Sequence, residues 1–248
     1  MPIVLEGGCR VAGLREGVPR QEGALRIRNH FGRESGAHAI SLRVLELEGG
    51  APAAWRNESS DEVLYVIDGG GIATIGGQRY DIAADHGLYA PPATTIELSA
   101  ISDMTLVSAQ CPEPGMQLDG YEAGQAIAGA PLVVAMHDRP VQRTGDRWYR
   151  EVINGDAGSA QVTQFVGAIP PGRAPDHYHL YEEVLCILEG EGAMWAGTSQ
   201  TPIAAGSCIY LPRRQMHCVE NRGVGELRLL GVFYPAGSPA VRYSSPQS

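Results

Sequence analysis

The chain has little that would let it enter a membrane or bind a polyanion. None of its apolar runs approaches the roughly 18 residues that a membrane-spanning helix needs. Positive charge is scarce: 19 Lys and Arg against 28 Asp and Glu give a net charge of −9 over 248 residues. This balance argues against nucleic acid or an anionic membrane as a partner. The first residues combine neither a basic segment nor a long apolar one, so we expect no signal peptide.

A disulfide framework is also lacking. The five cysteines are odd in number and form no C-x-x-C pair. We therefore expect a protein of the reducing cytoplasm. Cys186 and Cys218 lie in apolar stretches with a parity opposite to the histidines discussed below, which favours buried structural thiols over catalytic ones.

Helical periodicity sustained over three turns is absent from the first half of the chain. Short alternating segments bounded by glycine predict β-strands instead, and the 32 glycines and 17 prolines fit many tight turns. The predicted strands are residues 24–28, 39–47, 63–67, 71–75, 78–82, 88–90 and 94–98. This half is predicted to be all-β.

The second half repeats the first. A shift of 121 positions brings Glu62 onto Glu183, and it brings glycines and a proline at turns onto their equivalents. Further matched pairs are Gly69 and Gly190, Gly71 and Gly192, Gly76 and Gly197, Tyr89 and Tyr210, and Pro91 and Pro212. Matching turn residues imply matching backbone geometry, so both halves should have the same fold. A Pro- and Gly-rich junction at residues 111–131 separates them.

One stretch of the second half has the pattern of a metal site. His177 and His179 are one residue apart, so on a strand both would point to the same side. Glu183 follows four residues later, and His217 opens another apolar strand. Three imidazoles and a carboxylate suit Fe(II), Mn(II), Ni(II) or Zn(II), and do not suit Ca²⁺ or Mg²⁺.

This stretch resembles the two motifs of the cupin superfamily. Gly172, His177, His179, Glu183 and Gly190 follow the first motif, with four residues rather than five in its first gap. The second motif is matched by Gly206, Pro212, His217 and Asn221, while Arg214 stands where the family usually has glycine. With the internal repeat, the chain resembles a bicupin, which implies an all-β fold of two tandem jelly-roll barrels.

The resemblance implies that His177, His179, Glu183 and His217 bind one divalent transition metal, with Fe(II) or Mn(II) favoured. We expect an amino-terminal barrel at residues 1–125 and a carboxy-terminal barrel at residues 126–248. In the ungapped comparison, the first barrel has Arg56, Glu58 and Ile96 in place of the three histidines. It should therefore hold no metal, because arginine has no lone pair to give, and a structural or dimerisation role is expected.

The function implied by this resemblance is a mononuclear metal-dependent enzyme acting on a small organic acid or carbonyl compound. Metal-binding cupins of this ligand set favour a dioxygenase, in which Glu183 is also a candidate base. A metal-dependent isomerase, decarboxylase or lyase is one alternative. A non-catalytic metal- or ligand-binding module is the other.

Arginines near the motifs suggest where a substrate would bind. Arg173, Arg213 and Arg214 are either solvated loop charges or an electropositive rim for an anionic small-molecule substrate. Exposed edges of jelly-roll sheets favour a homodimer. Residues 236–248 are rich in Ser and Pro and predict a loose tail or an arm over a neighbour.

Overall fold

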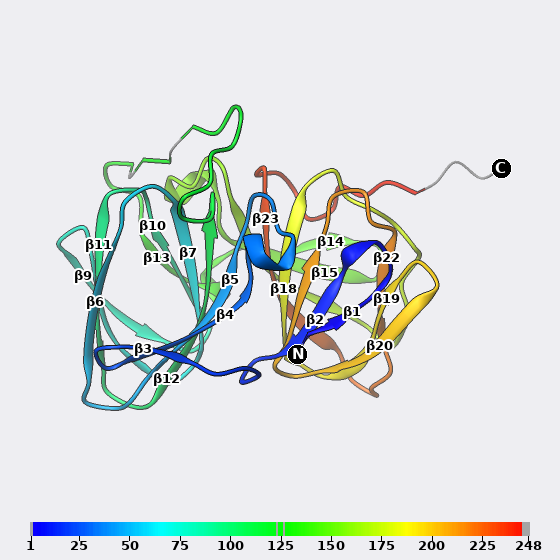
Figure 1. The fold of residues 1–248 in the computed structure, drawn as a ribbon, viewed down its shortest axis with the longest axis horizontal. Helices are drawn as coiled ribbons and strands as arrows, with labels where there is room; N and C mark the ends of the chain where they lie inside the picture. The colour runs from blue at the N-terminus through cyan, green and yellow to red at the C-terminus, as the bar shows by residue number, and fades with distance from the viewer. Residues whose placement is uncertain (1, 123, 126, 245–248) are drawn as a thin grey trace.

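Two β-barrels lie side by side in the computed structural model (Figure 1), which describes residues 2–122, 124–125 and 127–244. Each barrel combines one large sheet with one four-stranded sheet, and all strand pairs are antiparallel. The large sheets of the two barrels face each other. The prediction of an all-β protein built from two tandem jelly-roll barrels is confirmed.

The amino-terminal barrel has a seven-stranded sheet and a four-stranded sheet. The seven-stranded sheet has the order β13 (Val133–Ala135), β10 (His86–Ala90), β7 (Asp61–Asp68), β12 (Met104–Cys111), β5 (Leu42–Leu47), β4 (Leu25–Phe31), β3 (Arg20–Glu22). The second sheet has the order β6 (Pro52–Asn57), β11 (Thr94–Ala100), β8 (Gly70–Ile75), β9 (Gln78–Ala83). The strand segments predicted from alternation all fall within or overlap these elements.

The carboxy-terminal barrel is built in the same way. Its eight-stranded sheet has the order β1 (Ile3–Val4), β2 (Arg10–Gly13), β21 (Ser207–Leu211), β18 (Glu182–Glu189), β23 (Leu227–Tyr234), β16 (Thr163–Ile169), β15 (Arg147–Ile153), β14 (Gln142–Thr144). Its second sheet has the order β17 (Gly172–Arg173), β22 (His217–Asn221), β19 (Glu191–Ala196), β20 (Ser199–Ala204). Short 3₁₀ turns at Glu6–Gly8, Arg33–Ser35, Met136–Asp138 and Gly155–Ala157 complete the described elements.

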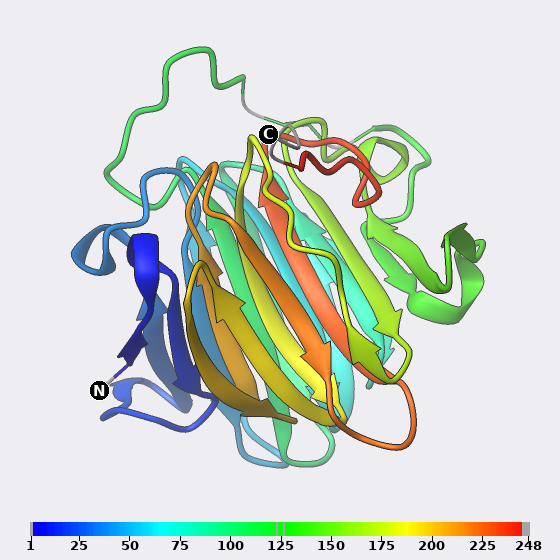
Figure 2. The same cartoon turned by 90° about the vertical axis from the view of Figure 1, so that its right-hand side faces the viewer.

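The two barrels exchange segments at their ends. Strand β2 pairs with β21 of the other barrel, so the beginning of the chain extends the carboxy-terminal sheet (Figure 2). In return, β13 pairs with β10 and extends the amino-terminal sheet. The predicted domain boundary between residues 125 and 126 stays a prediction. The sheets themselves are assembled from both sides of it.

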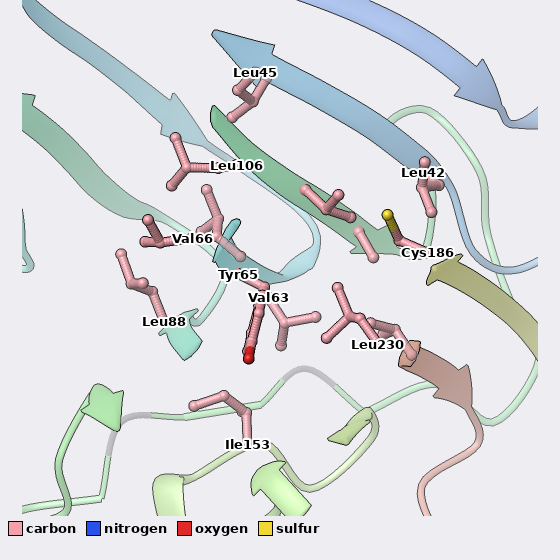
Figure 3. Packing of buried hydrophobic residues seen from close by; sticks show 14 of the residues in the cluster. Leu42, Leu45, Val63, Tyr65, Val66, Leu88, Leu106, Ile153, Cys186 and Leu230 are labelled. Atoms are coloured by element: carbon pink, nitrogen blue, oxygen red, sulfur yellow. The ribbon is translucent and has the colours of Figure 1, made fainter. Parts of the chain in front are cut away.

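Strand β18 shows how alternation builds both the interface and the barrel interior. Val184 and Cys186 belong to the core that joins the two large sheets, whereas Leu185 and Ile187 belong to the interior of the carboxy-terminal barrel. Figure 3 shows the interface core, where residues of the amino-terminal barrel such as Val63 lie beside Cys186 and Leu230. A strand whose two faces are both buried has little room for polar residues unless they are paired.

Two buried carboxylates at the interface are paired in equivalent ways. Glu182 points away from the barrel interior, accepts hydrogen bonds from the backbone N–H groups of residues 38, 39 and 40, and accepts a further one from the Tyr210 hydroxyl. Asp61, its counterpart in the repeat, accepts from the hydroxyls of Tyr89 and Tyr121. These bonds explain why a tyrosine recurs at the repeated position, and each fixes loop segments against a sheet.

All five cysteines are buried and form no disulfide, and for Cys186 and Cys218 this burial agrees with the prediction of structural thiols. Burial raises the pKa of the Cys9 thiol to about 12, which disfavours a reactive thiolate. Among the described residues, no helix is both long and apolar enough to cross a membrane.

Candidate metal centre

Three histidines converge at one end of the carboxy-terminal barrel. His177 and His217 form a two-way backbone bridge, with N···O distances of 3.0 and 2.8 Å. His179 lies two positions after His177. The ring centroids of the three imidazoles are 4.6 to 5.2 Å apart. One ring nitrogen of each lies within 4.8 Å of the others. The predicted His-x-His pair and the distant His217 therefore do meet.

Backbone carbonyls determine which ring nitrogen of each histidine faces the others. The Nδ1 atoms of His177, His179 and His217 lie 3.0, 2.9 and 2.8 Å from the carbonyl oxygens of residues 175, 241 and 215. A carbonyl only accepts, so each Nδ1 carries the proton and donates. Each Nε2 then keeps its lone pair, which is the form that binds a metal.

The electrostatics of the cluster favour neutral imidazoles. Burial, together with the interactions with His217 and His177, lowers the pKa of His179 to about 3. Burial likewise lowers the pKa of His217 to about 4. Near neutral pH these side chains are therefore unprotonated at Nε2, so a cation does not have to displace a proton to bind them.

Glu183 adds a buried carboxylate beside the histidines. Its Oε2 lies 3.9 Å from Nε2 of His179, and the side chain is 5% exposed. No described residue donates a hydrogen bond to it, and burial raises its pKa to about 8. Tyr181, stacked between the rings of His179 and Phe233, packs close by. An uncompensated buried carboxylate next to three lone pairs is what a cation would stabilise.

The four side chains border a cavity of about 100 Å³. Its walls are largely apolar and come from β16, β18, β22 and β23, including Phe165, Leu185, Val219 and Leu229. A space of this size holds a few water molecules or a small organic molecule. The arrangement therefore offers open space beside the candidate ligands.

The positive charges at this cavity are not those predicted from the motifs. Arg147, at the start of β15, and Arg242, near the carboxyl end, both line it. The sequence motifs do not single out either residue, because both lie more than 20 positions outside them. The charge of each arginine, together with burial, lowers the pKa of His177.

The three predicted arginines lie elsewhere among the described residues. The Arg173 guanidinium stacks 4.0 Å from the ring centroid of Trp195 and bonds to the carboxylate of Asp176 at 3.1 Å. Arg213 is exposed and lies 5.9 Å from the ring of Tyr234. None of these three arginines lines the cavity, so the lining of the cavity does not support their predicted role in substrate binding.

Arg214 has a structural explanation instead. Its backbone N–H donates to the carbonyl of His179 at 2.7 Å, and its φ is 62°. Ala93, its counterpart in the repeat, has a φ of 60°. The glycine usual at this motif position suits a left-handed turn. This chain makes the same turn in both barrels without glycine.

The described part of the predicted tail covers the site of its own barrel, whereas residues 245–248 of that prediction lie outside the described residues. The Val241 carbonyl accepts from His179, and Tyr243 forms a two-way backbone bridge with Tyr178, at 2.8 and 3.0 Å. Figure 2 shows this segment in red at the end of the barrel. The expectation of a loose tail or an arm over a neighbour is wrong for residues 239–243, because these hydrogen bonds hold them.

Comparisons with known proteins agree with this architecture. Residues 165–233 match the model of the cupin domain family. YlbA of E. coli superposes with a TM-score of 0.74 at 15% identity, covering 94% of this chain and 93% of that one. The chain has a bicupin fold. A putative glyoxylate-induced protein of Pseudomonas aeruginosa gives a TM-score of 0.75 at 16% identity, with coverage of 96% and 93%. A variant of Bacillus subtilis oxalate decarboxylase gives 0.71 at 16%, with coverage of 90% and 76%.

Curated relatives match over shorter stretches. Auxin-binding protein 1 of Arabidopsis thaliana is 28% identical over 120 residues, which are 43% of this chain and 61% of that protein. An uncharacterized protein of Methanocaldococcus jannaschii is 34% identical over 58 residues, covering 23% and 46%. The bicupin chain thus spans less than two thirds of the length of either relative.

The amino-terminal barrel of the bicupin has a carboxylate in the same place, with different neighbours. Glu62 is fully buried and accepts hydrogen bonds from four side chains. The donors are Arg43 at 2.5 Å, Ser108 at 2.7 Å, Gln110 at 3.2 Å and Trp55 at 3.3 Å. The carboxylate is compensated by these four donors, and among the described residues no His, Cys, Asp or Glu cluster that could hold a metal surrounds it.

Strand pairing shows that the ungapped alignment of the two halves is wrong by one residue at His177. Ile96, the counterpart of His217, pairs with Trp55, whereas His217 pairs with His177. Trp55, rather than Arg56, therefore occupies the place of His177. Arg56 points outward and pairs with the exposed Glu58. The conclusion that this barrel lacks the three histidines is unchanged.

Among the described residues, those that fit a transition metal lie in the carboxy-terminal barrel. Three imidazole Nε2 lone pairs and one buried carboxylate are the donor types preferred by Fe(II), Mn(II), Ni(II) and Zn(II). The backbone carbonyls at Nδ1 supply the outer hydrogen bonds that orient metal-binding histidines.

Proposed function

We propose that the carboxy-terminal barrel is a mononuclear metal site held by His177, His179, His217 and Glu183. We further propose that it makes the protein an enzyme acting on a small organic acid or carbonyl compound. The observation that carries this proposal is the cluster of three Nε2 lone pairs beside a buried, uncompensated carboxylate at a cavity. A divalent metal bound there would supply Lewis acidity and open positions for a substrate.

The residues of the chain prepare the site in three ways. The Nδ1–H bonds to backbone carbonyls orient the imidazoles before a ligand arrives. The apolar walls exclude water, which strengthens electrostatic interactions inside. Glu183, whose pKa burial raises to about 8, is suited either to bind the ion or to take a proton from a bound substrate near neutral pH.

We favour a dioxygenase as the reaction, because three histidines and a carboxylate leave coordination positions open. A decarboxylase or another reaction without net oxidation is the second candidate. It is supported by the fold similarity to a protein described as oxalate decarboxylase. A non-catalytic module with a structural metal is a third reading, which the cavity beside the ligands disfavours.

The decisive experiment is elemental analysis of freshly purified protein. We expect about one transition-metal ion per chain in the wild type and a loss of most of it in His177→Ala. The exposed His137, which lies outside the cavity, offers a matched control: His137→Ala should keep the metal. If the wild type takes up no metal even after reconstitution with Fe(II), Mn(II), Ni(II) and Zn(II), the proposal fails.

A second measurement separates the two reactions. The metal-loaded protein would be incubated with a panel of small 2-oxo and dicarboxylic acids, with and without O₂. Oxygen consumption that accompanies substrate loss supports the dioxygenase. Equal substrate loss without O₂, with release of CO₂, supports the decarboxylase instead.

A further inference from the structure

Arg147 and Arg242 bring two guanidinium groups to the cavity from segments far apart in the sequence. Arg147 begins β15, and Arg242 belongs to the carboxy-terminal segment that covers the site. The Arg147 side chain is only 17% exposed. The two guanidinium groups line the same cavity, and burial and the charge of Arg242 both lower the pKa of Arg147. Two like charges converging on an apolar cavity are costly unless an anion joins them.

The protein itself supplies little compensation for these charges. The carboxylate paired with Arg147 is that of Asp146, at a long 4.0 Å, and Asp146 is 77% exposed. Among the described residues, no carboxylate forms an ion pair with Arg242. Arg43 of the other barrel is different, because its guanidinium bonds to Glu62 at 2.5 Å. The donors of Arg147 and Arg242 are therefore available to a ligand.

The backbone fixes the position of Arg242. The residue before it, Val241, accepts the hydrogen bond from His179, and the residue after it, Tyr243, is bridged to Tyr178. Arg242 is thus held between two anchored residues directly beside the candidate metal ligands. Its charge lowers the pKa of His179, as does that of each neighbouring histidine, in addition to the effect of burial.

The two arginines that line the cavity both carry positive charge. Apart from Glu183, the titratable groups that line it are neutral imidazoles, a tyrosine pair and the two arginines. A divalent cation at the histidines would add further positive charge. Such a cavity concentrates anions and disfavours neutral or cationic molecules of the same size.

We infer that Arg147 and Arg242 bind the carboxylate of a small anionic substrate in the cavity and so select acids over their neutral analogues. This inference rests on the proposed function, since it assigns the substrate class of the same site. The planar guanidinium groups suit a carboxylate through paired N–H···O bonds. The 100 Å³ cavity limits the substrate to a small acid.

The test is calorimetric titration with malonate and with malonamide, its neutral analogue of similar shape. Wild-type protein would be titrated both after loading with Zn(II) and desalting, and after treatment with a chelator. We expect malonate to bind at least about tenfold more tightly than malonamide in both forms. Hydrogen bonds to charged groups of this kind have that magnitude.

Variants assign the effect to the two arginines. Arg147→Ala and Arg242→Ala should each weaken malonate binding by about tenfold or more, and Arg147→Lys should lose part of the affinity because it keeps the charge without the planar pair of donors. Arg222→Ala is the matched control: Arg222 lies outside the cavity and pairs with Glu220 at 2.8 Å. Its malonate affinity should equal that of the wild type.

The outcomes distinguish this inference from the proposed function. Unchanged malonate affinity in both alanine variants, or no malonate binding by the wild type, overturns the inference even if the metal content is normal. Absence of metal from every preparation overturns the metalloenzyme. The titrations of the chelator-treated protein still decide whether the arginines bind an acid. Arg242 is exposed, so Arg242→Ala should fold normally. This variant therefore tests the inference even if Arg147→Ala does not fold.

Discussion

The two barrels of this bicupin fold have a buried glutamate at the same place and surround it in opposite ways. Glu62 on β7 accepts hydrogen bonds from an arginine, a serine, a glutamine and a tryptophan. Glu183 on β18 has three imidazoles nearby and, among the described residues, no hydrogen-bond donor. One barrel compensates its carboxylate internally. The other barrel leaves its carboxylate without an internal partner, so that a bound ligand would have to compensate it.

Strand pairing identifies what replaced the donors. Gln110 lies opposite Glu62, whereas Phe233 lies opposite Glu183. Ser108 and Arg43 form a pair in the first barrel, and Gly231 and Phe165 form the corresponding pair in the second. The candidate metal centre therefore depends on the removal of donors as much as on the addition of histidines. Apolar residues in their place keep the carboxylate unsatisfied.

The largest effect should come from neutralising each glutamate in turn. In chelator-treated protein, Glu62→Gln leaves the Arg43 guanidinium, 14% exposed, without its counter-charge and should cost about 3 kcal/mol of unfolding free energy. Glu183→Gln should cost nothing or raise stability, because burial already disfavours the charged form. Chemical denaturation of both variants measures the difference. Equal losses in the two variants would mean that the two carboxylates are compensated alike.

The second-largest effect concerns Phe165 and Gly231, which stand where the first barrel has hydrogen-bond donors to its glutamate. A Cβ at Gly231 would overlap the ring of Phe165. Gly231→Ala should therefore destabilise the protein by about 2 kcal/mol, since the ring is confined in a packed interior. Gly225→Ala is the matched control, because no atom lies within 4 Å of its Cβ position. A thermal shift of the same size in both variants would contradict this account.

A third prediction concerns the segment that covers only the carboxy-terminal barrel. Deletion of residues 238–248 removes the Val241 carbonyl to which His179 donates. Loss of such an orienting partner should weaken metal binding by roughly 10- to 100-fold. Competition with a chromogenic chelator would measure it, and unfolding of the metal-free truncated protein would show whether the barrel stays intact. Unchanged metal affinity with an intact barrel would show that the carbonyl does not orient His179.

The smallest effect is expected at the turn that both barrels share. Arg214→Gly and Ala93→Gly should each stabilise the protein by about 0.5 to 1 kcal/mol, since both residues adopt a positive φ that costs a β-carbon-bearing residue energy. Arg214→Ala keeps the β-carbon and serves as control, with no gain expected. Thermal unfolding of the three variants would measure this, and a gain in the alanine variant would point to charge rather than backbone strain.

Local patterns were sufficient to predict the fold and the histidine cluster. Alternation and turn glycines predicted the strands, the repeat predicted two equivalent halves, and the cupin resemblance implied that each half is a barrel. The two histidine motifs gave a cluster whose ring nitrogens lie within 4.8 Å. All of these features are encoded within short stretches, where side-chain period and turn geometry follow directly from residue type.

Features that depend on distant contacts were not predictable. His179 and the Val241 carbonyl are 62 positions apart, and Arg147 and Arg242 lie far from either motif. Arg173, Arg213 and Arg214 seemed better placed only because they are close to the ligands in sequence. The one-residue offset at Trp55 arose because a gapless shift cannot follow a register change within the repeat.

Because the two barrels exchange end segments, the strands of the carboxy-terminal sheet cannot assemble in the order in which they are synthesised. Val11 faces Ile209 across β2 and β21, so β2 leaves the ribosome long before its partner strand is made. Such long-range pairing slows folding, because a large loop must close before the contact forms. A gene fragment for residues 126–248 would give a sheet with β21 at an uncovered edge, open to pairing with other chains. The barrel with the candidate metal centre is thus tied to the segment of chain that supplies β2.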